Sequence, residues 1–223
     1  MTKALFFQAI AKFFAGVLLV GVLSFLPAGT LRYAAGWRLM AVLFVPMFLA
    51  GLVMMAKSPE LLRSRLKAKE TRGEQGTVVK LSGLMFLVGF ILAGLDFRFG
   101  WLPLPEIVSY AATAAFLLAY LLYAEVLREN VWLSRTIEVR EGQTVVDTGL
   151  YGIVRHPMYS ATLLLFLSMP LVLGSLIALL PFFCYPLIIA RRIRDEEVFL
   201  EEALAGYAAY KKKVKYRIIP LIW

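Results

Sequence analysis

Long apolar stretches separated by short polar segments make up most of the first 130 residues. A helix needs about 20 mainly apolar residues to cross a lipid bilayer, and four stretches approach or reach that length. No small-residue cleavage site follows the first of them, so we expect a retained helix and not a signal peptide. The pattern predicts transmembrane helices at Leu5–Leu26, Gly36–Ala56, Leu81–Leu95 and about Ile107–Leu127.

A fifth apolar block, Pro157–Ala190, is longer than one span and is interrupted by Gly174-Ser175. Its halves hold 17 and 15 residues. As helices they would reach roughly 25 and 22 Å, short of a hydrocarbon core about 30 Å thick. The block therefore predicts a tight helical hairpin that turns at Gly174-Ser175. Its second arm is expected to continue out of the membrane into the charged run Arg191–Glu202.

Two shorter patterns complete the expected fold. Ser58 and Pro59 form a capping residue followed by a proline at the first helical position, which predicts a short helix at the membrane interface. Thr136–Thr148 has a strand-like composition around a Glu141-Gly142 turn. We therefore predict an all-α integral membrane protein with about six helical segments. Residues 1–223 should form one membrane domain, with four spans in 1–130 and a polar loop, the hairpin and a C-terminal helix in 131–223.

Composition and charge add an orientation to this picture. The chain is 61% hydrophobic and 17% charged, whereas soluble domains carry about 25% charged residues. Of its 24 lysines and arginines, 21 fall on one side of the predicted spans. Because positive residues are retained in the cytoplasm, we expect both termini to be cytoplasmic. A single cysteine and a single histidine argue against a disulfide framework or a multi-histidine metal centre.

Two polar clusters flank the predicted hairpin. Gly149–Tyr159 enters it and Arg191–Glu197 leaves it, so the hairpin would bring them together at one membrane–water boundary. Such a site suits an amphiphilic substrate with a polar head in water and a tail between helices. Simpler explanations remain open for each part: Pro157 starts a helix, the arginines anchor it, and the acids form a solvated face. Arg192 and Glu196 are four residues apart and share a helix face.

Other chemistries lack their signatures in the sequence. There is no glycine-rich dinucleotide fingerprint, no phosphate-loop lysine and no paired-histidine zinc motif. Tyrosines and basic residues alternate in Tyr207–Arg217, and beside transmembrane spans this predicts a membrane-surface helix and not a nucleic-acid site.

The two clusters and the C-terminal segment resemble the signature of the isoprenylcysteine carboxyl methyltransferase family. The similarity covers about residues 136–223, and the four predicted spans match only in character. The matching motifs are Gly149-x-Tyr151-x-x-x-Arg155-His156-Pro157-Met158-Tyr159, Glu196-Glu197-x-x-Leu200, Tyr207-x-x-Tyr210-Lys211-Lys212-Lys213-Val214 and Arg217-x-x-Pro220.

This resemblance implies a membrane methyltransferase that uses S-adenosylmethionine, bound in a cytoplasmic pocket at the hairpin ends. By motif, Arg192 would contact the acceptor and act in catalysis. No metal is expected. A carboxylate acceptor needs no strong base, because it is already a nucleophile, so orientation by an arginine and desolvation could suffice. The implied cofactor-binding residues are Gln143, Thr144, Val145, Val146, Tyr151, His156, Pro157, Met158, Tyr159 and Glu196.

Three alternatives stay open. Phospholipid amine N-methylation is the main rival within the methyltransferases. Sterol and steroid reductases, which would use NADPH, resemble the chain at Arg194-Asp195-Glu196 and at residues 214–220. A non-enzymatic lipid-binding role leaves the clustered motifs unexplained. The expected partners are a lipid or lipid-modified acceptor and membrane lipids, without nucleic acid, in the inner membrane if the source is bacterial.

Overall fold

The computed structural model describes residues 3–66, 73–133 and 138–223, and the regular structure in these ranges is helical. The all-α class predicted from the sequence is confirmed. The helices are α1 (Lys3–Ala28), α2 (Ala34–Lys57), α3 (Pro59–Leu66), α4 (Gly73–Phe99), α5 (Glu106–Glu129), the 3-10 turn η1 (Gly149–Gly152), α6 (Pro157–Val172), α7 (Leu179–Phe182), α8 (Cys184–Ala203) and α9 (Tyr207–Lys213).

Helices α1, α2, α4 and α5 are long and apolar enough to cross a membrane and correspond to the four predicted spans. Helix α4 begins eight residues before the predicted Leu81, because hydropathy locates the apolar part of a helix and not its hydrogen-bonded ends. Large apolar side chains such as Leu18, Val45 and Leu121 are exposed on these helices. Apolar surface of this extent is typical of contact with lipid.

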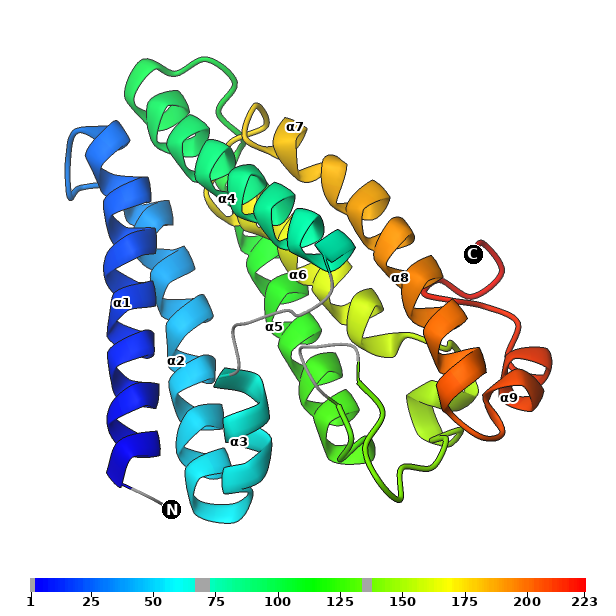
Figure 1. Cartoon of the computed structure of the whole chain (residues 1–223). Coiled ribbons are helices and arrows are strands. Elements are labelled where there is room, and N and C mark those ends of the chain that lie inside the picture. Colours follow the sequence, from blue (N-terminus) through cyan, green and yellow to red (C-terminus); the bar gives the residue numbers. More distant parts are fainter. Residues whose placement is uncertain (1–2, 67–72, 134–137) are drawn as a thin grey trace.

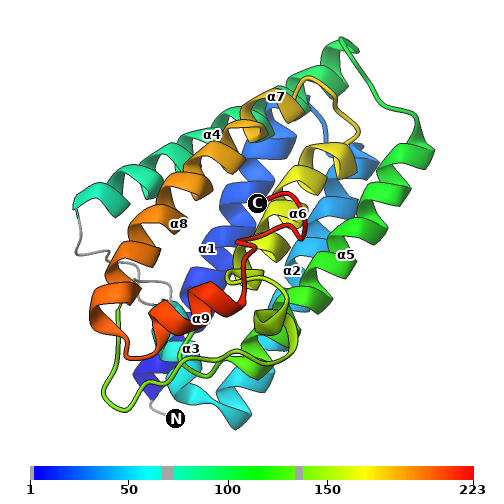
Figure 2. The same cartoon turned by 90° about the vertical axis from the view of Figure 1, so that its right-hand side faces the viewer.

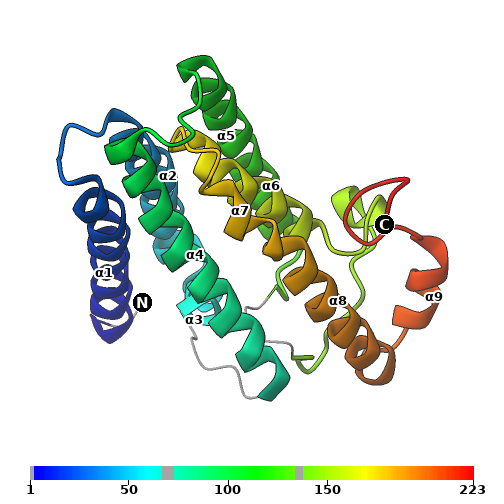
Figure 3. The same cartoon turned by 90° about the horizontal axis from the view of Figure 1, so that it is seen from above.

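The bundle has α1 and α2 on one side and α8 and α9 on the other, as seen from above in Figure 3. Helix α1 packs against α4 and α2, while α6 packs mainly against α5. Side chains from distant parts of the sequence meet in one core, including the fully buried Leu39, Phe116, Phe182 and Ile193. The N-terminus, α3 and α9 lie at the same end of the bundle, the lower end in Figure 1.

The predicted hairpin is confirmed, and its turn lies at the predicted position. Gly174 has a left-handed backbone with φ 75°, and the Ser175 amide donates to the carbonyl of Pro170 over 3.1 Å. The arms are not tightly paired as expected, however. Helix α6 packs on α5, where Ala112, Ala119 and Ala161 are buried, and α7 and α8 pack mainly on α4. Small side chains allow close helix contact, which favours α5 over α8 as the partner of α6.

A buried carboxylate ties the hairpin turn to the segment between α4 and α5. Asp96 accepts hydrogen bonds from the Leu102 amide (2.7 Å) and from the Ser175 hydroxyl (2.5 Å). Two backbone hydrogen bonds join the same segments, from Leu104 to Gly174 and from Leu176 to Leu102. The turn is therefore held in place at the end of the bundle opposite α9.

The predictions for the two shorter segments, the helix after Ser58 and the strand-like segment at 136–148, had different outcomes. Helix α3 begins at Pro59 as predicted, and the Lys12 ammonium donates to the Leu66 carbonyl at its end. The strand-like expectation was wrong for residues 138–148, where the structure describes no strand; residues 136–137 lie outside the described ranges. Around the predicted turn at Gly142, the Gln143 amide instead donates to the Arg140 carbonyl, and the Arg140 amide donates to the Gln143 side-chain oxygen. Local bonds of this kind replace those of a sheet.

Candidate active site at the splayed end of the hairpin

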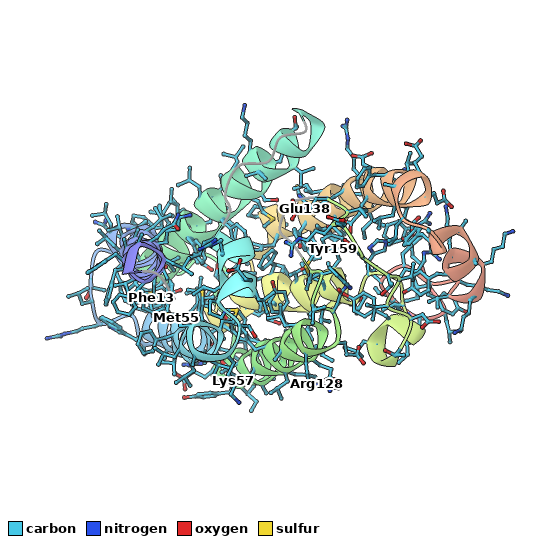
Figure 4. The ribbon with its side chains drawn as sticks, turned by 60° about the horizontal axis from the view of Figure 1, so that its bottom comes forward. Phe13, Met55, Lys57, Arg128, Glu138 and Tyr159 are labelled. Carbon is cyan, nitrogen blue, oxygen red and sulfur yellow. The ribbon has the colours of Figure 1, made fainter. Side chains whose placement is uncertain are left out.

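An open cavity lies where α6, α8, α9, η1 and the loop before η1 meet. Viewed toward that end of the bundle, Glu138 and Tyr159 lie near its middle, apart from Phe13, Met55 and Lys57 on the α1–α2 side (Figure 4). Pro157 is buried as the first residue of α6 and is not a lining residue. Ten of the eleven predicted site residues line the cavity: Gln143, Thr144, Val145, Val146, Tyr151, His156, Met158, Tyr159, Arg192 and Glu196.

The hydroxyl of Tyr159 joins the two residues that sequence reasoning singled out on α8. It donates to Glu196 Oε2 over 2.6 Å and accepts from Arg192 Nε over 2.8 Å. The ring is buried near the start of α6. A cation and an anion one helical turn apart are thereby held at a fixed position in the cavity wall.

His156 lies between two carboxylates. Its Nε2 is 3.3 Å from Glu197 Oε1, and its Nδ1 is 4.0 Å from Glu196 Oε1. The side chain is 6% exposed and lines the cavity. Contact with Glu197 on one ring nitrogen orients the imidazole toward the cavity.

Glu197 is the centre of a buried ion network. Its carboxylate accepts from Arg155 Nε at 2.7 Å and from Arg217 Nε at 3.0 Å. Arg155 also donates to the carbonyls of Val214 and Lys215. Glu197 is 2% exposed, so the alternative of a solvated acidic face is wrong for this residue. The C-terminal segment lies against α6 in Figure 2, and this network helps to hold it there.

Burial alone would raise the pKa of the Glu197 carboxyl. Hydrogen bonds and positive charge from His156 and Arg155 outweigh burial and lower the pKa to about 2. The carboxylate is therefore ionised at neutral pH, which keeps the network intact.

The η1 turn and the contacts of its residues position Tyr151. Gly149 has φ 49°, and a Cβ there would overlap the carboxylate of Glu129, which accepts the Leu150 amide at 3.0 Å. The Tyr151 hydroxyl accepts from Asn130, and its carbonyl accepts from the Tyr210 hydroxyl. A glycine is therefore required at position 149.

Several lining residues were not assigned to the site from the sequence. Helix α9 is shorter than the predicted surface helix, and its two tyrosines are buried in the cavity wall. Some of these residues occur in the motifs that carry the family resemblance, but the sequence assigned no role in the site to them. No local signal identifies those before η1. The unassigned lining residues are Asn130, Trp132, Leu133, Glu138, Arg155, Leu200, Leu204, Tyr207 and Tyr210.

Fold and site together define a multi-pass helical membrane protein with a polar cavity at one end of its bundle. The model of the isoprenylcysteine carboxyl methyltransferase (ICMT) family matches residues 110–202. This matching region runs from α5 almost to the end of α8, and over it the chain is similar to the ICMT family of methyltransferases.

The chain is also similar to sterol reductases. It is 36% identical over 92 residues to the Delta(14)-sterol reductase TM7SF2 of Mus musculus. It is 30% identical over 93 residues to the Delta(14)-sterol reductase of Methylotuvimicrobium alcaliphilum. Each match covers 40% of this chain and 22% of the relative. The chain thus spans about a fifth of the length of these relatives.

Proposed function

We propose that this protein transfers a methyl group from S-adenosylmethionine to an amphiphilic acceptor at the boundary between membrane and cytoplasm. The carboxylate of an isoprenylcysteine-like molecule is the acceptor that we favour. One observation carries the proposal: Tyr159 joins Arg192 and Glu196 in a single cavity beside an apolar helical hairpin. The arginine suits an anionic acceptor, and the glutamate suits a cationic cofactor.

The residues of the cavity fit this cofactor in their chemistry. Ligand sites combine apolar walls with a few polar groups that fix the orientation of the ligand. Glu138 and Glu196 bring carboxylates to its wall, while Val145, Leu200 and Leu204 supply apolar surface. When bound, S-adenosylmethionine supplies an electrophilic methyl group on a positively charged sulfur.

The acceptor carboxylate would be bound and oriented by Arg192. A guanidinium can hold a carboxylate through two parallel hydrogen bonds. Tyr159 accepts from Nε of Arg192, which fixes the plane of the group. Because an ionised carboxylate already has a nucleophilic lone pair, positioning and exclusion of water are the tasks left to the protein.

Two rival reactions make different demands. An amine acceptor must lose a proton before attack, so phospholipid N-methylation would require a base. Reduction of a sterol is favoured by the identity to the two Delta(14)-sterol reductases and would require NADPH.

Calorimetry on the detergent-purified protein distinguishes the cofactors. We expect S-adenosylhomocysteine to bind, and Glu196→Gln to raise its dissociation constant. Binding of NADPH without a response to S-adenosylhomocysteine would contradict the methyltransferase proposal. Mass spectrometry of lipid extracts with and without the enzyme then identifies the acceptor by the gain of one methylene.

A further inference from the structure

Tyr207 presents a buried hydroxyl that has no partner within the protein. Among the described residues, two buried side-chain polar atoms lack a hydrogen-bond partner, the hydroxyls of Ser24 and Tyr207. Ser24 lies within α1, whereas Tyr207 lines the cavity and is 4% exposed. Buried polar groups in proteins are nearly always hydrogen-bonded, so an unpartnered hydroxyl in a cavity wall indicates a contact made by a ligand.

The side chains that pack against Tyr207 are mainly apolar, and Arg155, Glu196 and Glu197 lie close enough to affect the pKa of its hydroxyl. Tyr207 packs in a cluster with Leu204, Tyr210 and Val214, against which Val145 and Leu200 also lie. Arg192, in the middle of α8, and Tyr159, near the start of α6, line another part of the wall, where they bond to each other. Because the Tyr210 hydroxyl is bonded to the Tyr151 carbonyl, this apolar surface presents one unpartnered hydroxyl, that of Tyr207, which suits a flat heteroaromatic base.

The position of Tyr207 is fixed by contacts of the residues that follow it on α9. Lys213 pairs with Asp147 at 2.7 Å, and Lys211 pairs with Glu201 at 2.9 Å. The neighbouring Tyr210 donates to the Tyr151 carbonyl. Burial and the nearby Glu197 raise the pKa of the Tyr207 phenol, so the hydroxyl keeps its proton and can donate it.

We propose that the Tyr207 hydroxyl donates a hydrogen bond to a ring nitrogen of the adenine base of the cofactor. This assignment rests on the proposed use of S-adenosylmethionine. It makes Tyr207 a specificity-determining residue for the base, separate from the Arg192–Tyr159–Glu196 group.

Replacement of Tyr207 by phenylalanine tests the proposal through thermal stability and ligand affinity. Only the affinity should decrease. Tyr207→Phe removes only an oxygen without a partner, so the melting temperature should stay unchanged or rise. The dissociation constants of S-adenosylhomocysteine and of methylthioadenosine, which lacks the amino acid part, should both rise about 3- to 10-fold. If both dissociation constants rise by the same factor, the lost contact lies in the nucleoside part that the two ligands share.

Tyr185→Phe is the matched control. Its hydroxyl donates to Thr162 at 2.8 Å, and Tyr185 is not a lining residue. This variant should lower the melting temperature and leave both dissociation constants unchanged. Analogues in which CH replaces one ring nitrogen of the base provide a second test. One of them should bind the wild type more weakly than the parent ligand does. Tyr207→Phe should bind that analogue and the parent ligand equally well.

The outcomes separate this inference from the proposed function. Unchanged dissociation constants in Tyr207→Phe, or a loss confined to S-adenosylhomocysteine, would overturn the assignment while the cofactor proposal stands. The assignment would equally fail if no base analogue distinguished the two proteins. If the wild type bound neither probe, the proposed cofactor itself would be refuted, and this assignment with it.

Discussion

At the scale of single residues, the hydroxyl of Tyr159 links Arg192 and Glu196 through two hydrogen bonds. The spacing of the two residues alone does not predict this link. Four residues apart on one helix, an arginine followed by a glutamate is the weaker order for stabilising the helix. The structure places a third group between them, and that group comes from the other arm of the hairpin. The pair is therefore better explained as part of a site than as support for α8.

Arg192→Ala should weaken use of the acceptor by roughly 10- to 150-fold, because loss of a charge-assisted contact costs about 1.5–3 kcal/mol. Affinity for S-adenosylhomocysteine should stay nearly intact. Arg192→Lys should restore activity only in part, since an ammonium cannot reproduce a planar two-pronged contact. Steady-state kinetics and calorimetry on each folded variant provide the two readouts.

Arg191→Ala is the control, because Arg191 is an exposed neighbour on the same helix and does not line the cavity. It should alter neither readout. If Arg192→Ala changed only the folding yield, with both constants of the folded fraction unchanged, Arg192 would be an anchor of α8 and not a site residue.

At the scale of elements, Glu197 connects three parts of the fold that border the cavity. It lies on α8, Arg155 precedes α6, and Arg217 belongs to the C-terminal segment. Removing one member of a buried ion network leaves the others unpaired, which typically costs about 3–5 kcal/mol. The network therefore determines how the ends of α6 and α8 meet.

The pKa of Glu197 makes the stability of this junction depend on pH. A carboxyl whose folded-state pKa is lowered stabilises the fold above its ordinary value of about 4.3, and the contribution disappears as pH falls toward the folded value. With a pKa of about 2 in the folded protein, the melting temperature should fall as pH is lowered from about 5 toward 2.

Glu197→Gln should melt at a lower temperature at pH 7 and lose that part of the acid dependence. Glu201→Gln, in a partly exposed pair with Lys211, should change stability little. An acid profile in Glu197→Gln with the same slope as the wild type would show that other carboxyl groups cause the dependence.

At the scale of the whole molecule, the basic residues and the hairpin together predict the topology. Positive charge concentrated on one side favours cytoplasmic termini. In the structure the N-terminus, α3 and α9 lie at the end that holds the cavity (Figure 1). Reporter fusions at both termini should therefore report the cytoplasm, and a reporter inserted between α4 and α5 should report the opposite side.

A C-terminal fusion active only on the opposite side would contradict this topology. It would require residues 157–190 to cross the membrane once, which the turn at Gly174 does not permit within this fold.

The sequence by itself determined what depends on local preference. Apolar length located the four spans, and Gly174 and Pro59 marked a turn and a helix start. The motifs at the two ends of the hairpin also identified part of the cavity wall. These features are readable because hydropathy, glycine and proline act on the residues that carry them.

Only the tertiary structure decided which of these elements touch. The splay of α6 and α8 follows from their packing on α5 and α4, and the inward face of α9 follows from its contacts with the loop before η1. Glu197 is buried because Arg155, 42 positions before it, and Arg217, 20 after it, converge on one carboxylate. A charged residue has the same local sequence signal whether it is solvated or paired, because the energy that distinguishes the two comes from partners distant in the chain.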